Sequence, residues 1–185
     1  PPRSTLFPYT TLFRSNRSES PSTIHAMPVF VDGRVYVAGG GDIWWGKRQA
    51  WLMCIDASQT GDVTSTAGVW SYALTRHALS TPAVWNGLVF VADAGRKIHC
   101  VEAATGRPCW THDIQGEMWS STLVADGKVY VGTRRGEFIV LAADREKRVL
   151  SSSLLDSPIS GTPVAANGRL YVATQRKLYA LKKQP

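Results

Sequence analysis

The side chains that could carry chemistry in this 185-residue chain are its histidines, acidic residues and cysteines. The four histidines show no spacing typical of metal ligands: His25, His77, His99 and His112. His112 and Asp113 are neighbours that could form an acid–base pair, but no nucleophile is placed beside them. Calcium takes about six to eight oxygen ligands, whereas the Asp residues here mostly occupy turns, where Asp is favoured for local reasons. The sequence therefore predicts no catalytic, cofactor-binding or metal-binding residue.

The three cysteines are an odd number, so at least one thiol is free or pairs outside the chain. If residues 103–106 form the loop of a hairpin, Cys100 faces Cys109 across two antiparallel strands. Directly opposed residues have Cα atoms about 4.5–5.5 Å apart, a distance that a disulfide tolerates. One hypothesis is a cross-strand disulfide in an oxidising compartment, and the other is a pair of buried thiols that behave as small hydrophobic groups.

The strands that must position these side chains are marked by a recurring tight turn. Its four copies are Asp32-Gly33, Asn86-Gly87, Asp126-Gly127 and Asn167-Gly168. Asn-Gly or Asp-Gly between alternating apolar runs indicates a hairpin with a type I′ turn, because both central residues need a positive φ. The intervals from Gly87 to Gly127 and from Gly127 to Gly168 are 40 and 41 residues. A period near ~40 residues with four strands per unit is typical of a β-propeller blade.

We therefore predict an all-β protein made of about four four-stranded blades. The blades lie near residues 26–75, 80–115, 120–156 and 161–182, within a domain spanning residues 21–185. Two insertions at hairpin loops, residues 39–49 and 58–68, lengthen the first repeat. We predict that residues 1–20 are either an artefactual or a disordered leader, and residues 1–15 closely resemble the conceptual translation of a sequencing adapter. Such a segment would not belong to the protein, and any signal peptide or lipid-attachment cysteine of the true N-terminus would then be missing from this sequence.

Residues Glu102 to Trp110 (EAATGRPCW) resemble the Ala-x-Asp-x-x-Thr-Gly-x-x-x-Trp tryptophan-docking motif of pyrroloquinoline-quinone-type propeller repeats. In that family the Trp packs between neighbouring blades and the Thr-Gly closes the hairpin that presents it. The resemblance implies docking roles for Thr105, Gly106 and Trp110, and for Trp70 as the displaced docking residue of the first repeat. In the third repeat the motif has decayed, and Leu150 stands where the Trp is expected. Residues 26–181 are most similar to the BamB-like group of this family.

The resemblance implies a seven- or eight-bladed ring, so we expect this chain to be the C-terminal half of a longer protein. An open array would leave two apolar faces exposed to water. The implied function is a non-catalytic binding or scaffold propeller of the bacterial cell envelope, in a periplasmic, envelope-bound or secreted location. The alternative is a fragment of a quinone-dependent dehydrogenase, which alone would bring pyrroloquinoline quinone and calcium. The Cys-Cys pair frequent in such enzymes is absent from this sequence.

A basic pair occurs in the loop between the second and third strands of every repeat. In a propeller these loops meet the connections between blades on one face, where positive potential could attract an acidic ligand or protein. We call this predicted surface the basic face: Lys47, Arg48, Arg76, His77, Arg96, Lys97, Glu117, Trp119, Arg134, Arg135, Arg176 and Lys177. The alternative is that hairpin loops simply carry solvated charge. Nucleic acid is not expected, because aromatic and basic residues do not interleave, and no apolar run reaches the ~20 residues of a membrane span.

Overall fold

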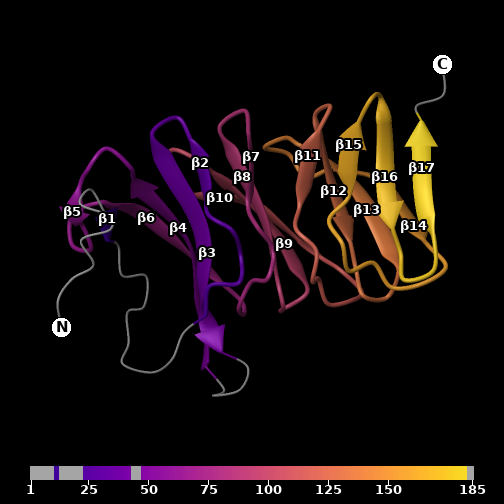
Figure 1. The fold of residues 1–185 in the computed structure, drawn as a ribbon, viewed down its shortest axis with the longest axis horizontal. Coiled ribbons are helices and arrows are strands. Elements are labelled where there is room, and N and C mark those ends of the chain that lie inside the picture. The colour runs from indigo at the N-terminus through magenta and orange to yellow at the C-terminus, as the bar shows by residue number, and fades with distance from the viewer. Residues whose placement is uncertain (1–10, 13–22, 43–46, 183–185) are drawn as a thin grey trace, which may run out of the picture.

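The computed structural model describes residues 11–12, 23–42 and 47–182. This part of the chain forms strands and turns without a helix, so it contains no helix able to cross a membrane. Four antiparallel sheets follow one another along the chain and stand side by side in a row (Figure 1). The predicted all-β fold of propeller blades is confirmed, and within the described residues no strand pairing closes the row into a ring.

Each sheet is one blade, with its strands in chain order. Blade 1 comprises β2 (Val29–Val31), β3 (Arg34–Asp42), β4 (Lys47–Asp56) and β6 (Gly68–Leu74). Blade 2 comprises β7 (Ala83–Trp85), β8 (Leu88–Asp93), β9 (Lys97–Glu102) and β10 (Pro108–Asp113). Blade 3 comprises β11 (Leu123–Ala125), β12 (Lys128–Gly132), β13 (Glu137–Ala142) and β14 (Val149–Leu154). Blade 4 has three described strands, β15 (Val164–Ala166), β16 (Arg169–Ala173) and β17 (Leu178–Lys182).

The recurring turns adopt the predicted backbone conformation. In blade 2, Asn86 and Gly87 have φ values of 46° and 73°, and in blade 4 Asn167 and Gly168 have values of 51° and 67°. Both central residues of these turns are therefore left-handed, as a type I′ turn requires. The turns fix the register of the hairpin formed by the first two strands of each blade. In every blade, the residue three positions after the turn glycine therefore pairs with the first residue of the first strand.

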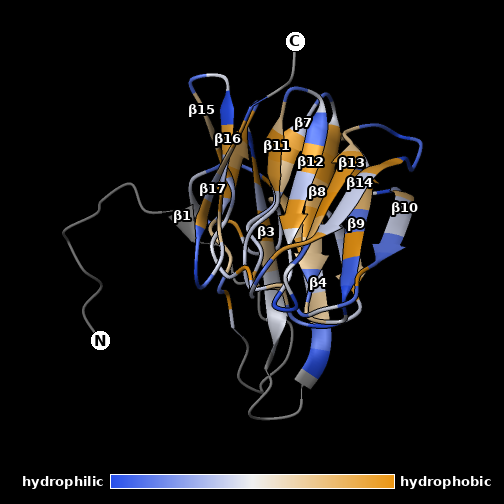
Figure 2. Cartoon of the chain, turned by 90° about the vertical axis from the view of Figure 1, so that its right-hand side faces the viewer, coloured by the Kyte–Doolittle hydropathy of each residue, from blue (hydrophilic) through white to orange (hydrophobic). Residues whose placement is uncertain are grey.

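Apolar side chains fill the spaces between neighbouring blades. Strand β8 is buried on both faces because blade 2 lies between two other blades, whereas β14 and β15 are exposed along their whole length. Figure 2 shows hydrophobic residues along the strands of the sheets and hydrophilic residues along many of the loops. Among the described residues, the cluster between blades 3 and 4 has only three buried members, Phe138, Ile159 and Val172. Burial therefore decreases toward the C-terminal end of the row.

The second insertion of the first repeat covers the outer face of blade 1. Val63 and Ala67 from this insertion are buried against Val37 and Met53 of the blade. Successive residues of a strand point to opposite faces, and the neighbours of Val37 in β3 pack toward blade 2 instead. The insertion also contains β5 (Gly61–Asp62), which pairs in parallel with β1 (Thr11–Leu12). The rest of the predicted leader, residues 1–20, lies outside the described residues.

A buried polar network joins blade 1 to blade 2. Asp93 and His99 are each 1% exposed, and His99 Nε2 lies 3.0 Å from Asp93 Oδ2. The other ring nitrogen of His99 lies 3.0 Å from the hydroxyl of Tyr72 in blade 1. Thr75, at the end of the same blade, donates both its backbone N–H and its hydroxyl to Asp93 Oδ2, at 2.7 and 2.5 Å. Both blades therefore contribute groups to one hydrogen-bonded cluster around a single carboxylate.

Candidate functional site: the basic face and the joints between blades

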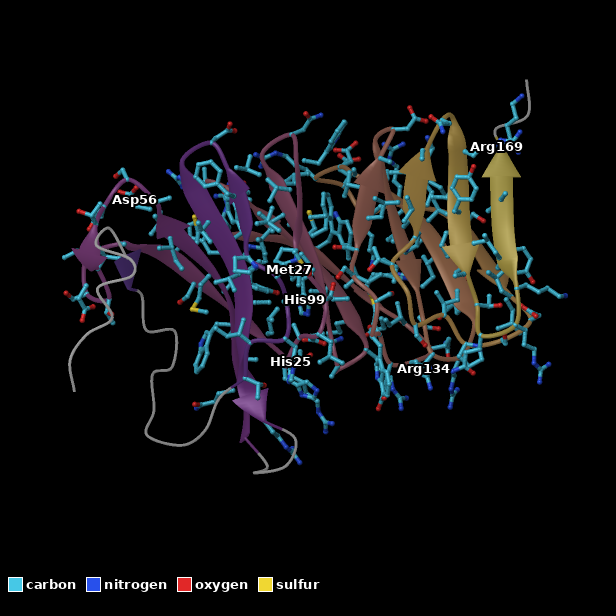
Figure 3. The ribbon with its side chains drawn as sticks, in the orientation of Figure 1. His25, Met27, Asp56, His99, Arg134 and Arg169 are labelled. Carbon is cyan, nitrogen blue, oxygen red and sulfur yellow. The ribbon has the colours of Figure 1, made fainter. Side chains whose placement is uncertain are left out.

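The basic face is built by one contact that recurs between blades. Ala94, in the loop between β8 and β9, donates its N–H to the carbonyl of His77 in the preceding connection, at 2.9 Å. The same contact joins Arg134 to Glu117 at 2.8 Å. In blade 4, Gln175 N donates to Pro158 O at 3.0 Å. These bonds hold the second-to-third-strand loops of blades 2, 3 and 4 against the connections between blades, so both kinds of segment share one end of the molecule, where Figure 3 labels His25 and Arg134.

Local acidic residues neutralise two of the predicted cations. Lys97 forms an ion pair with Asp113 of the neighbouring strand. Lys177 lies 3.8 Å from Asp156, which comes from the connection before blade 4. These acids follow from strand pairing and from the path of the connections, which the basic pairs themselves do not indicate. The free positive charge on this face is therefore smaller than the number of basic residues suggests.

Several cations of the basic face have no such partner. Within the described residues, Arg76, Arg96, Arg135 and Arg176 form no ion pair, and all four side chains are exposed. They come from the connection before blade 2 and from the loops of blades 2, 3 and 4. Their spacing along consecutive blades produces a row of uncompensated guanidinium groups at one end of the molecule.

An aromatic residue lies within this row. Trp119 is 53% exposed, and the guanidinium carbon of Arg134 lies 4.5 Å from its ring centroid. Arg134 also donates to the hydroxyl of Ser160 at 2.6 Å, which holds the guanidinium in place. An exposed Trp beside Arg is typical of residues that contribute strongly to protein–protein binding. Ser160 was not predicted as a member of this site, because nothing in its local sequence marks it.

The remaining predicted members lie toward blade 1. His77 is half-buried, and burial lowers the pKa of its imidazole, with a smaller effect from the nearby His25. A Cβ at Gly41 would lie 2.7 Å from the Cβ of His77, so the glycine allows the connection to approach β3. Arg48 is exposed in β4, and the side chain of Lys47 lies outside the described residues. The face therefore continues onto blade 1 through His77 and Arg48.

We call the interface between two neighbouring blades a joint. The joint between blades 1 and 2 shows why the predicted docking positions hold Trp, Thr and Gly. Trp70 of blade 1 donates its indole N–H to the carbonyl of Ala103 in blade 2, at 2.9 Å. Gly106 has a φ of 71°, and a Cβ there would lie 2.6 Å from the Trp70 ring. Thr105 donates its hydroxyl to Glu102 at 2.7 Å, which fixes the same turn. The Thr-Gly turn therefore forms a surface onto which the indole of the preceding blade packs.

Trp110 makes the corresponding contact at the joint between blades 2 and 3. Its indole N–H donates to the carbonyl of Asp144 at 2.9 Å, and its side chain is 9% exposed. Phe90 lies beside it, with ring centroids 5.9 Å apart. Each of the first two joints therefore contains one indole that donates to the turn of the following blade.

A β-bulge in the outer hairpin of each complete blade changes the predicted register. Cys54 pairs with Trp70, Cys100 pairs with Trp110 and Val140 pairs with Ser151, with one extra residue inserted just before each of these outer-strand partners. The extra residue of such a bulge has no direct partner. The prediction that Leu150 takes the Trp position is therefore wrong by one residue. Ser151 occupies that position in blade 3.

The same bulge corrects the expected position of the cysteines. The predicted direct opposition of Cys100 and Cys109 is wrong, because Cys100 pairs with Trp110 and Cys109 is the extra residue. Burial raises the pKa of the Cys100 thiol, and the adjacent Cys109 thiol raises it further. Both thiols are free in the structure and remain neighbours. A disulfide between them stays a prediction for an oxidising compartment.

A cluster of charges connects blades 2 and 3 beside Trp110. Glu102 accepts hydrogen bonds from Arg107 at 2.9 Å and from Arg145 of blade 3 at 2.5 Å. Arg107, Thr105 and Arg145, in that order of effect, lower the pKa of Glu102 from 4.5 to about 2. The folded state therefore favours the ionised carboxylate more than the unfolded chain does.

This shift predicts an acid-dependent contribution to stability. Because the folded pKa lies below the unfolded value, the contribution is present above pH 4.5 and is lost as the pH falls toward 2. We expect the Glu102→Gln variant to unfold at a lower temperature than the parent at pH 6. The difference should shrink between pH 4.5 and pH 2. Thermal melts across this range test the prediction, and a difference that stays constant down to pH 2 contradicts it.

The described residues contain no group of three or more His, Cys, Asp or Glu side chains arranged to hold a metal ion. Pyrroloquinoline quinone and calcium belong to the dehydrogenase alternative alone. The uncompensated guanidinium groups and the exposed indole of Trp119 can recognise a partner by charge and by aromatic contact.

Comparison with known proteins gives a consistent family assignment. The family model for outer membrane protein assembly factor BamB matches residues 11–118, 54–149 and 96–184. The quinohemoprotein alcohol dehydrogenase of Comamonas testosteroni is 25% identical over 146 residues, covering 69% of this chain and 21% of that protein. Outer membrane protein assembly factor BamB of Nitrosomonas eutropha is 27% identical over 116 residues, covering 61% of this chain and 28% of that protein. The chain thus spans less than a third of either relative.

Solved structures show the same fold. The crystal structure of BamB from Moraxella catarrhalis has a TM-score of 0.62 at 15% identity, covering 89% of this chain and 61% of that chain. The computationally designed Ika8 protein has a TM-score of 0.69 at 11% identity, covering 92% of this chain and 48% of that chain. At these identities the likeness concerns the fold alone.

Proposed function

The chain belongs to the family of outer membrane protein assembly factor BamB, and from this premise we propose that it is a non-catalytic binding propeller of the bacterial cell envelope. Its basic face is the surface that meets a protein partner, in the periplasm or at the membrane surface. The observation that carries the proposal is the row of uncompensated arginines around the exposed Trp119. Arg and Trp are enriched among the residues that dominate protein–protein affinity.

Charge complementarity gives the partner its expected chemistry. Cations without ion pairs attract an acidic surface and raise the association rate, and salt weakens this effect. A partner that places carboxylates against Arg135 and Arg176, and an apolar group against Trp119, fits the described surface. The BamB of Nitrosomonas eutropha is by its name an assembly factor for outer membrane proteins. We therefore place the partner among envelope proteins of that kind.

A charge-reversal experiment tests the proposal. The variant Arg135→Glu/Arg176→Glu changes the basic face, and Arg169→Glu/Lys182→Glu makes the same charge change at the opposite end, where Figure 3 labels Arg169. Outer-membrane proteins extracted from Nitrosomonas eutropha serve as the immobilised ligand in surface plasmon resonance. We expect the basic-face variant to associate about tenfold more slowly at low salt and the control to match the parent. Equal association by both variants contradicts the proposal.

The second candidate function is a fragment of a quinone-dependent alcohol dehydrogenase. The observation that favours it is the relation to the Comamonas testosteroni enzyme and to the 1-butanol dehydrogenase (cytochrome c) of Thauera butanivorans, which is 29% identical over 122 residues. Any quinone and calcium ligands would have to be completed by residues beyond those described. Among the residues that the structure describes, the uncompensated surface charge favours the binding function.

A further inference from the structure

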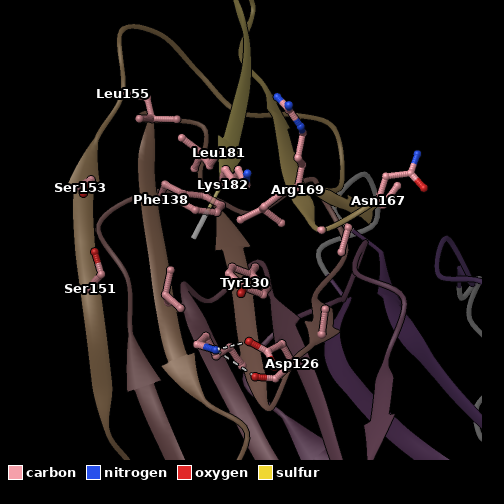
Figure 4. Close-up of a pocket in the computed structure, with 17 residues that line it drawn as sticks. Asp126, Tyr130, Phe138, Ser151, Ser153, Leu155, Asn167, Arg169, Leu181 and Lys182 are labelled. Carbon is pink, nitrogen blue, oxygen red and sulfur yellow. Dashed lines mark hydrogen bonds and ion pairs between the residues drawn. The ribbon is translucent and has the colours of Figure 1, made fainter. Parts of the chain in front are cut away.

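The third joint between blades contains a pocket where the first two joints contain an indole. The pocket has a volume of about 960 Å³ and lies between blades 3 and 4, lined by strands of both sheets (Figure 4). Its walls are mainly apolar, formed by Tyr130, Phe138, Val140, Leu155, Leu170 and Leu181.

The register of the outer strand of blade 3 explains this pocket. Ser151 pairs with Val140, lines the pocket beside it, and occupies the position that Trp70 and Trp110 hold in the first two blades. A serine leaves vacant the volume that an indole fills at the other two joints. The rings of Tyr130 and Phe138 stack at 6.3 Å with an interplanar angle of 16°, which provides an aromatic wall beside this space.

Among the described residues, no uncompensated charge points into the pocket. Leu170 and its cross-strand partner Leu181 face blade 3, so Arg169 and Lys182, one residue along each strand, point to the opposite face of blade 4. Lys128 lies 2.8 Å from Asp126, and these two lining residues neutralise each other. A charged ligand would therefore lose its hydration without gaining a counter-charge, which is costly. The lining favours a neutral ligand.

Three hydroxyl groups give the apolar walls their polar contacts. Tyr130, Ser151 and Ser153 line the pocket, and their hydroxyls form no hydrogen bond with another described residue. A hydroxyl can both donate and accept a hydrogen bond, so these groups suit a ligand with one N–H or one oxygen. At the first two joints the docked ring likewise makes one hydrogen bond, from its indole N–H to a carbonyl.

We propose that this pocket binds a small, neutral aromatic molecule with one hydrogen-bonding group, whose ring takes the place of the missing indole. The volume is within the range of about 300–1,000 Å³ that ligand sites occupy. The aromatic wall and the leucines bury the ring, and the hydroxyls orient its polar atom. The site is separate from the basic face and does not depend on the function proposed for that face.

The charge selectivity is tested with three probes of similar size. Isothermal titration calorimetry measures the binding of indole to the 185-residue chain. Competition with bound indole then measures the affinity of the same site for the anion indole-2-carboxylate and the cation 1-methylquinolinium. We expect indole to bind at least about tenfold more tightly than either ion, with an affinity that added salt does not lower. Equal affinity for either ion, or no binding of indole at millimolar concentration, overturns the proposal.

Matched variants test the location. Ser151→Trp places an indole in the pocket and should abolish the binding of free indole, whereas Ser152→Trp, at the next residue of β14 and outside the pocket lining, should leave it unchanged. Undiminished binding of indole by Ser151→Trp overturns the proposal. If Ser151→Trp fails to fold, nuclear Overhauser contacts in the parent protein still decide. Contacts from indole to the rings of Tyr130 and Phe138 support the site, and contacts confined to other residues overturn it.

Discussion

Replacing Trp110 by alanine is expected to lower the free energy of unfolding by about 3–5 kcal/mol, the range measured for large aromatic residues in protein cores. The side chain is 9% exposed, packs beside Phe90 and donates to the carbonyl of Asp144 in the next blade. Its loss would leave a cavity in the joint between blades 2 and 3 and would remove the hydrogen bond from the indole to the Asp144 carbonyl. Urea unfolding followed by circular dichroism measures the change.

Trp119→Ala is the matched control for this prediction. Trp119 is 53% exposed, so its removal should change stability by only about 0.5 kcal/mol. The same variant should weaken partner binding, because Trp119 belongs to the basic face. Comparable losses of stability in the two variants would show that Trp110 is not a docked residue.

Replacing Asp93 by alanine is expected to lower the free energy of unfolding by about 3–5 kcal/mol, because several buried hydrogen-bonding groups lose their partner and each such loss costs about 1–3 kcal/mol. The change leaves the buried His99 ring and the N–H of Thr75 without their acceptor. Burial alone would raise the pKa of Asp93, but the hydrogen bonds from His99 and Thr75 together hold it below its ordinary value. The carboxylate is therefore ionised in the folded protein at neutral pH, and its contribution to stability declines as the pH falls through its folded pKa.

Asp113→Ala tests whether burial rather than charge explains this cost. Asp113 forms an ion pair with Lys97, but its side chain is 81% exposed. Water screens exposed ion pairs, so they contribute little to stability, and this variant should unfold close to the parent in urea. If Asp93→Ala also unfolds close to the parent, the network between blades 1 and 2 does not stabilise the joint as described.

Local chemistry in the sequence was sufficient to predict the fold. Each Asn-Gly or Asp-Gly turn requires left-handed backbone at both central residues, and the structure has this conformation at Asn86 and Gly87. The bulges were missed because any residue type can occupy the extra position, as Cys109 and Leu150 do. Because the bulge of blade 3 contains one extra residue, Leu150, the position equivalent to the docked Trp of blades 1 and 2 is occupied by Ser151. The pocket could not be recognised until strand pairing made that correction.

The functional surfaces were predictable to different degrees. The basic pairs predict a face formed by a set of loops, but its net charge depends on partners that are distant in sequence. Asp113 and Asp156 neutralise two lysines because strand pairing and connections bring them there. The opposed pair Arg169 and Lys182 is visible only after the register of β16 and β17 is known. Tertiary pairing therefore decides which charges stay uncompensated.

The central claim is that one position in the outer strand determines whether neighbouring blades are docked through an indole. Thermal and urea unfolding of Ser151→Trp, beside Ser152→Trp, tests it most directly. Filling an apolar pocket commonly adds about 0.5–2 kcal/mol, so Ser151→Trp should be more stable than the parent by an amount in this range. Ser152→Trp should match the parent. Stability of Ser151→Trp that equals or falls below that of Ser152→Trp would contradict the claim.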